Sequence, residues 1–184
     1  VIEGREVRFC CDPCVGKFEA DTKAGFKKID EQIIKAQMPY YPATECLASG
    51  ASAHTGGKVK NAVYNNRLVR ICCDGCKDNF KKDPKPYMAK LDKAAIAQQD
   101  KAYPLTTCPI TGMELGSMGE PIKAVVGGRL VKFCCKGCVP KFKANPGAGL
   151  AKIDAAWKGK YGDDLGKVLA QKPAKVRKIA GGRG

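Results

Sequence analysis

The sequence has no run of about 18 apolar residues, the length needed to cross a bilayer, so we expect no segment of it to span a membrane. No nucleophile, no pair of carboxylates and no glycine-rich phosphate loop indicates catalysis, and we therefore expect a protein that is not an enzyme. Acidic residues are also few, with 18 Asp and Glu against 33 Lys and Arg. The resulting net charge of +15 is typical either of a protein with an acidic partner or of a generally solvated basic surface.

Cysteine, in contrast, is abundant, and nine of the eleven cysteines belong to one motif that occurs three times. The motif reads G-R-L-V-K-F-C-C-K-G-C at residues 128–138, and related copies occupy residues 4–14 and 66–76. The first cysteine of each triplet stands at position 10, 72 or 134, so the spacing is 62 residues both times. An uninterrupted repeat of this length indicates tandem copies of one small domain.

The two remaining cysteines, Cys46 and Cys108, precede the second and third triplets by equal intervals. The first triplet has no such partner, and the chain has no initiator methionine, so we interpret Val1 as the start of a processed or partly observed chain. We expect its gene to encode an upstream Tyr-Pro and a cysteine.

The predicted organisation is an incomplete repeat at residues 1–38, complete repeats at 39–101 and 102–158, and a basic tail at 159–184. This tail has few large apolar residues, and we expect it to become ordered only on a partner.

Each complete unit is predicted to have a small ββαα fold of the α+β class. Strands at residues 123–126 and 131–133 flank a Gly127-Gly128 turn, and the same alternation predicts a strand over residues 1–9. After the triplet the apolar spacing becomes helical, with a proline that can open a second helix. A unit of about 60 residues has a marginal core, so we expect a metal or disulfide bonds to stabilise it.

The cysteines are predicted to converge from three elements. Cys134 ends a strand, Cys138 lies in the first turn of a helix, and Cys108 lies in a loop with turn-forming Pro109 and Gly112. Thiolates that meet in this way suit soft metal ions, and we predict Zn²⁺, with Cu⁺ as the alternative. The predicted metal ligands are Cys10, Cys11, Cys14, Cys46, Cys72, Cys73, Cys76, Cys108, Cys134, Cys135 and Cys138.

Whether the second cysteine of each triplet binds the metal decides the kind of site. We predict that Cys135, and Cys73 in the middle unit, complete a closed four-thiolate zinc site. If they do not, three sulfurs suit trigonal Cu⁺, and the vicinal cysteine becomes a spare thiol for metal transfer or for a disulfide.

Three segments resemble the heavy-metal-binding domains called TRASH and YHS, which share an architecture with treble-clef zinc ribbons. They are C-P-I-T-G-M at Cys108, F-C-C-K-G-C at Phe133 and F-K-A-N-P-G-A-G-L at Phe142. Two departures are Thr111, where the family's loop often carries a cysteine, and Cys135, where serine is common. The resemblance covers nearly all of residues 1–158. It implies binding, storage, sensing or delivery of zinc or copper by tandem treble-clef-like domains.

Several alternatives stay open. The metal could serve only to stabilise each small domain, or the cysteines could form disulfide bonds in an exported protein. A zinc-ribbon protein that binds nucleic acid in the cytoplasm, or a purely structural protein, would also fit the basic charge. Our leading hypothesis is a periplasmic or cell-envelope protein of a bacterium that binds protein partners in a larger assembly. We expect His54 to be a surface residue, and Met113 and Met118 to serve in packing.

Overall fold

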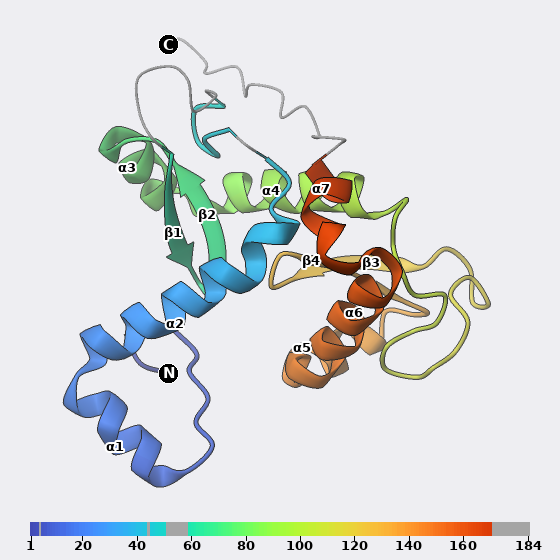
Figure 1. Cartoon of the computed structure of the whole chain (residues 1–184), viewed down its shortest axis with the longest axis horizontal. Helices are drawn as coiled ribbons and strands as arrows, with labels where there is room; N and C mark the ends of the chain where they lie inside the picture. Colours follow the sequence, from blue (N-terminus) through green and yellow to red (C-terminus); the bar gives the residue numbers. More distant parts are fainter. Residues whose placement is uncertain (4, 44, 51–58, 171–184) are drawn as a thin grey trace.

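A computed structural model of the chain describes residues 1–3, 5–43, 45–50 and 59–170 (Figure 1). The described part combines helices with small antiparallel sheets, so the α+β class is confirmed. None of its helices has the length and hydrophobicity that a bilayer crossing requires. In chain order the elements are α1 (Asp12–Ala20), α2 (Thr22–Gln37), the 3-10 helix η1 (Met38–Tyr40), β1 (Lys60–Tyr64), β2 (Arg67–Ile71), α3 (Asp74–Lys82), α4 (Pro84–Gln99), β3 (Ile122–Val126), β4 (Arg129–Phe133), α5 (Cys138–Ala144), α6 (Pro146–Tyr161), the 3-10 helix η2 (Gly162–Asp164) and α7 (Leu165–Ala170).

Two β-hairpins, β1-β2 and β3-β4, form the two sheets. Their pairing is the same once positions are shifted by 62 residues, since Lys60 faces Ile71 as Ile122 faces Phe133. The turn residues have the positive φ values that a tight hairpin needs, 45° and 58° at Asn65-Asn66 and 55° and 78° at Gly127-Gly128. The second strand of each hairpin runs directly into the cysteine triplet, as the alternating pattern predicts.

The first copy has helices but no hairpin. The predicted strand over residues 1–9 is wrong, because the described residues there form only an isolated bridge between Ile2 and Arg5. In the register of β1-β2, the positions opposite Val7 and Phe9 would lie before Val1. Among the residues that the structure describes, Val7 and Phe9 have no partner strand. Figure 1 shows α1 and the start of α2 projecting away from both hairpins.

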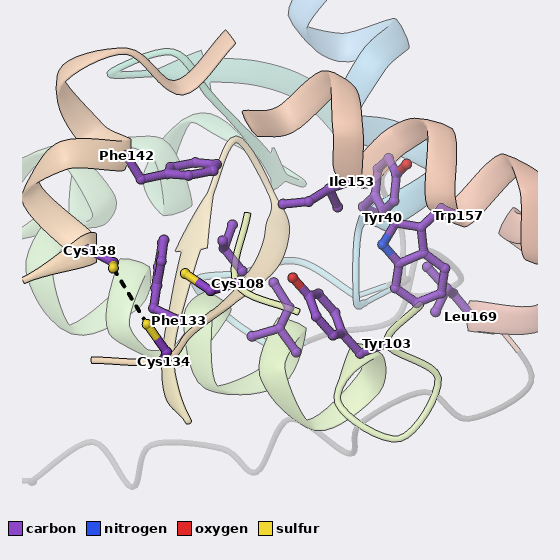
Figure 2. Packing of buried hydrophobic residues seen from close by; sticks show 12 residues of the cluster. Tyr40, Tyr103, Cys108, Phe133, Cys134, Cys138, Phe142, Ile153, Trp157 and Leu169 are labelled. Atoms are coloured by element: carbon purple, nitrogen blue, oxygen red, sulfur yellow. Dashed lines mark hydrogen bonds between the residues drawn. The ribbon is translucent and has the colours of Figure 1, made fainter. Parts of the chain in front are cut away.

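A short helix and a 16-residue helix follow each triplet. Pro84 and Pro146 begin α4 and α6, as predicted, because a proline at the first helical position loses no hydrogen bond. Figure 2 shows the core of the third unit, where Phe133, Phe142 and Trp157 are all 0% exposed. The predicted apolar stripe of the long helix therefore forms a core against the hairpin.

One ion pair recurs in all three copies. An arginine at one repeat position, which starts the second strand in the two complete units, binds an aspartate 25 residues later on the long helix. In the third copy both Nε and Nη2 of the arginine donate to the carboxylate at 2.9 Å. This two-point contact orients the strand on the helix. The pairs are Arg5–Asp30, Arg67–Asp92 and Arg129–Asp154.

Consecutive copies are joined by a buried glutamine that ends α2 in the first copy and α4 in the second. Gln99, which is 0% exposed, donates from Nε2 to the Gly128 carbonyl at 2.9 Å. Its Oε1 accepts the Leu130 N–H at 2.7 Å. Gln37 ends α2 and makes the equivalent two bonds to the β1-β2 hairpin, at 2.8 and 2.9 Å. Each hairpin is therefore held by the long helix of the preceding copy.

The segment after residue 158 is not a mobile tail over its described part. Helix α6 continues to Tyr161, whose hydroxyl donates to the Ala102 carbonyl at 2.9 Å. Leu169 in α7 is 2% exposed and packs in the core of the third unit, while Gln98 on α4 donates to its carbonyl at 2.8 Å. The expectation that this segment becomes ordered only on a partner is therefore wrong for residues 159–170, because Leu169 is buried, Tyr161 and Leu165 pack against the same core, and two hydrogen bonds hold the segment. Residues 171–184 lie outside the described part of the chain.

Candidate metal centres

Cys108, Cys134 and Cys138 bring three sulfurs together in the third unit (Figure 2). The Sγ atoms all lie within 4.8 Å of one another, and the three residues are only 1–3% exposed. The Cys134 and Cys138 sulfurs are 3.7 Å apart. Sulfurs bound tetrahedrally to zinc at about 2.3 Å would be about 3.8 Å apart, so this spacing fits a thiolate metal site.

Local backbone geometry explains how these sulfurs meet. Strand β4 ends at Phe133 and α5 begins at Cys138, so the chain turns between the two cysteines. In the loop, the Cys108 N–H donates to the Met113 carbonyl at 2.8 Å, and the Gly112 N–H donates to the Cys108 carbonyl at 2.9 Å. Gly112 has φ +73°, a conformation that glycine adopts without strain. The predicted convergence of loop, strand end and helix start is confirmed.

The middle unit contains the same arrangement. Cys46, Cys72 and Cys76 form a triad whose sulfurs also lie within 4.8 Å of one another. Cys46 is fully buried, and the other two are half-buried. The Gly50 N–H donates to the Cys46 carbonyl at 2.8 Å with φ +67° at Gly50, which repeats the loop turn of the third unit. His54, the predicted surface residue, lies outside the described residues.

The first triad is different because it is exposed and contains the vicinal cysteine. Cys10, Cys11 and Cys14 place their sulfurs 3.3–3.6 Å apart at the start of α1. Cys10 and Cys11 are exposed and Cys14 is half-buried. All eleven cysteines are free thiols in this structure, and even the 3.3 Å pair is far from the about 2.05 Å of a disulfide bond.

The predicted fourth ligands lie beside the two buried triads without belonging to them. Cys135 Sγ is 3.7 Å from Cys138 Sγ, and Cys73 Sγ is 3.8 Å from Cys72 Sγ. Neither belongs to a group whose sulfurs all lie within 4.8 Å of one another. The closed four-thiolate site therefore stays a prediction, and three sulfurs are what each complete unit brings together.

Hydroxyl groups that the sequence analysis did not assign to the site face these sulfurs. Thr111 Oγ1 is 3.4 Å from Cys134 Sγ, and Ser49 Oγ is 3.8 Å from Cys72 Sγ. Both hydroxyls stand three residues after the loop cysteine, and this shared position in the repeat is the sequence feature from which their place at the site could have been predicted.

Met113 and Met118 are 45% and 60% exposed, and the expectation that they serve in packing is wrong.

The loop cysteine of each complete unit has a lowered pKa. Burial raises the pKa of Cys108, but hydrogen bonds from the Thr111 hydroxyl and from backbone amides outweigh burial and lower the pKa to about 6. The equivalent contacts of Ser49 and nearby amides oppose burial and lower the pKa of Cys46 to about 7. Burial and hydrogen bonds with the neighbouring thiols instead raise the pKa of Cys138 to about 12. At a pH above both of these lowered values, the loop cysteine of each complete unit is therefore mainly a thiolate before any metal binds, while Cys138 and its repeat mate Cys76 keep their protons.

This asymmetry predicts proton release on metal binding. At about pH 7.5, Zn²⁺ added to the metal-free protein should release at least one proton at the third triad, because Cys138 must lose its proton to bind the ion. At about pH 5, below the pKa of Cys108, a second proton should be released per ion, and the affinity should be lower. A pH indicator in weakly buffered solution measures the protons. Binding without proton release would contradict this assignment of protonation states.

No family model, curated protein or solved structure matches the chain. The case for metal binding therefore rests on the residues of this chain, and membership of the TRASH and YHS group stays a prediction.

Proposed function

We propose that the chain is a non-enzymatic metal-binding protein that holds a thiophilic ion, Zn²⁺ or alternatively Cu⁺, in each complete repeat. The observation that carries this proposal is the pair of equivalent cysteine triads, each with sulfurs within 4.8 Å of one another. Cys108, Cys134 and Cys138 would hold one ion, and Cys46, Cys72 and Cys76 the other. A bound ion would balance the negative charge of three thiolates and would link the loop, the end of the strand and the start of the helix.

The burial of the loop cysteines supports a stable metal site over a chance proximity of sulfurs. Cys46 is 0% exposed and Cys108 1%, and each is surrounded by donors that stabilise its thiolate. The cysteines of the third triad belong to the hydrophobic core itself, together with Phe133 and Phe142. Loss of the ion would leave the sulfurs of three cysteines in that core without a bound metal. Binding of the ion would therefore contribute directly to the free energy of folding.

The wider setting is part of the same proposal. We place the chain in the bacterial periplasm or cell envelope, as one of the TRASH- or YHS-like proteins that bind, store or deliver metal in a larger assembly. The net charge of +15 suits an acidic protein partner.

Titration of the reduced, metal-free protein with Co²⁺ tests the proposal. Two equivalents should give intense sulfur-to-metal charge-transfer bands and the visible bands of a tetrahedral ion, and Zn²⁺ should then displace the Co²⁺. Any further equivalent would report the exposed first triad. Weak bands typical of octahedral oxygen ligands would contradict thiolate binding.

A further inference from the structure

Each copy carries a C-x-x-C pair around the start of its first helix. In the two complete units, the first cysteine of the pair lies outside the triad and the second belongs to it. Paired cysteines at this spacing commonly take part in thiol–disulfide exchange. The pairs are Cys11–Cys14, Cys73–Cys76 and Cys135–Cys138.

The paired sulfurs are close enough to bond after small side-chain movements. Cys135 Sγ and Cys138 Sγ are 3.7 Å apart, against about 2.05 Å in a disulfide bond. The backbones are held together by the turn, in which the Cys138 N–H donates to the Cys135 carbonyl at 3.3 Å. In the middle unit the Lys77 N–H donates to the Cys73 carbonyl at 3.1 Å, so the helix itself holds the equivalent pair.

Accessibility singles out the first cysteine of each pair. In the third unit Cys135 is half-buried, whereas Cys108 and Cys138 are 1–2% exposed; in the middle unit Cys73 is exposed, whereas its pair member Cys76 is half-buried. A disulfide-containing molecule from solution can therefore reach the sulfur outside the triad before it reaches the buried ones. That sulfur then lies next to a member of the triad.

We propose that a low-molecular-weight disulfide removes the metal from each complete unit by oxidising its C-x-x-C pair, with Cys73 or Cys135 as the point of attack. The Cys135 sulfur attacks the external disulfide, forms a mixed disulfide and releases one thiol. The Cys138 sulfur then attacks Cys135 Sγ, closes the Cys135–Cys138 bond and releases the second thiol. Two protein thiols thus lose two electrons, and one external disulfide is reduced to two thiols.

Closure of this bond takes a ligand from the metal. The third triad would keep only Cys108 and Cys134, and the middle triad only Cys46 and Cys72, which is too few for a stable thiolate site. The release of metal rests on the proposed function, whereas the disulfide closure does not. The chain would accordingly hold its metal where low-molecular-weight disulfides are scarce and lose it where they accumulate.

The first experiment uses the reduced, metal-free full chain and glutathione disulfide. Peptide mapping by mass spectrometry should find Cys73–Cys76 and Cys135–Cys138 as the main products, each with a loss of two hydrogens. Stable glutathione adducts at Cys73 and Cys135, or a dominant bond between Cys134 and Cys135, would overturn the proposal. This result does not depend on metal binding.

The second experiment compares two zinc-loaded proteins, both carrying Cys11→Ser so that the exposed first triad contributes to neither. One has no other change, and its matched partner also carries Cys73→Ser and Cys135→Ser. Glutathione disulfide should release zinc from the first protein more than about tenfold faster than from the second, as followed with a chromogenic chelator. Equal release rates would overturn the proposal while leaving the metal sites intact. Failure of both proteins to load zinc would instead refute the proposed function, and the mapping of the metal-free chain would still decide the disulfide chemistry.

Discussion

Replacement of Cys138 by serine is expected to remove one metal ion per chain and to unfold the third unit. Its sulfur is 2% exposed, lies 3.7 Å from Cys134 Sγ and belongs to the core that contains Phe142. Structural zinc contributes on the order of 10 kcal/mol to the folding of small domains, so loss of one of three thiolates should cost a large part of that stabilisation. Zinc content and the fluorescence of Trp157, the single tryptophan and a residue of this core, measure the two effects.

The matched control is Cys135→Ser, which changes a neighbouring cysteine outside the triad. This protein should keep its zinc and its Trp157 fluorescence, because the three sulfurs of the triad are unchanged. Equal loss of zinc in both variants would contradict the three-sulfur site and favour the four-thiolate site that the sequence predicts. Full zinc retention in Cys138→Ser would contradict the triad itself.

The second large effect is expected at the joint between copies. Gln99→Leu should destabilise the third unit by about 2–5 kcal/mol, because the Gly128 carbonyl and the Leu130 N–H would both lose a buried partner. Urea unfolding followed by Trp157 fluorescence measures this change in the unit that receives the glutamine.

Gln32→Leu on the exposed face of α2 is the control, and it should change the free energy of unfolding by less than about 0.5 kcal/mol. A comparably small change for Gln99→Leu would show that the hairpin does not depend on the preceding copy. The copies would then be independent domains on one chain.

Local features of the chain were predictable because short-range geometry determines them. The glycine and asparagine pairs permit the positive φ of a tight turn, and the alternation before each triplet marks Val131 and Phe133 as buried. It does not account for Leu130, which is 0% exposed although it lies on the opposite face of the strand. Pro84 and Pro146 mark the helix starts for an equally local reason. These signals sufficed for the hairpins, for the helices and for the convergence of the cysteines.

Features that depend on distant partners could not be predicted in this way. Gln37 and Gln99 share a repeat position, but a glutamine at a helix end is usually exposed, and only the neighbouring hairpin explains its burial. Residues 1–9 have the pattern of a strand, but the described part of the chain offers them no strand to pair with. The docking of α7 depends on two leucines, Leu165 and Leu169, which are too little apolar surface to recognise in a basic segment.

The adjacent cysteines of each triplet show a further limit of prediction from the sequence. Their sulfurs would point to opposite faces if the strand continued, but the chain leaves the strand at Phe133 and turns before α5. The direction of each sulfur therefore depends on the turn, which the sequence pattern does not specify. This turn places Cys135 near Cys138 without including it in the triad.

The central claim is that each complete unit binds one thiophilic ion through its triad, and elemental analysis of the natively purified, reduced chain tests it most directly. Purification without chelators should yield at least two equivalents of zinc or copper per chain, one for each buried triad. Cys46→Ser and Cys108→Ser should each remove one equivalent. A chain that retains all eleven thiols, carries less than about 0.1 equivalent of either metal and takes up none on titration would contradict the account.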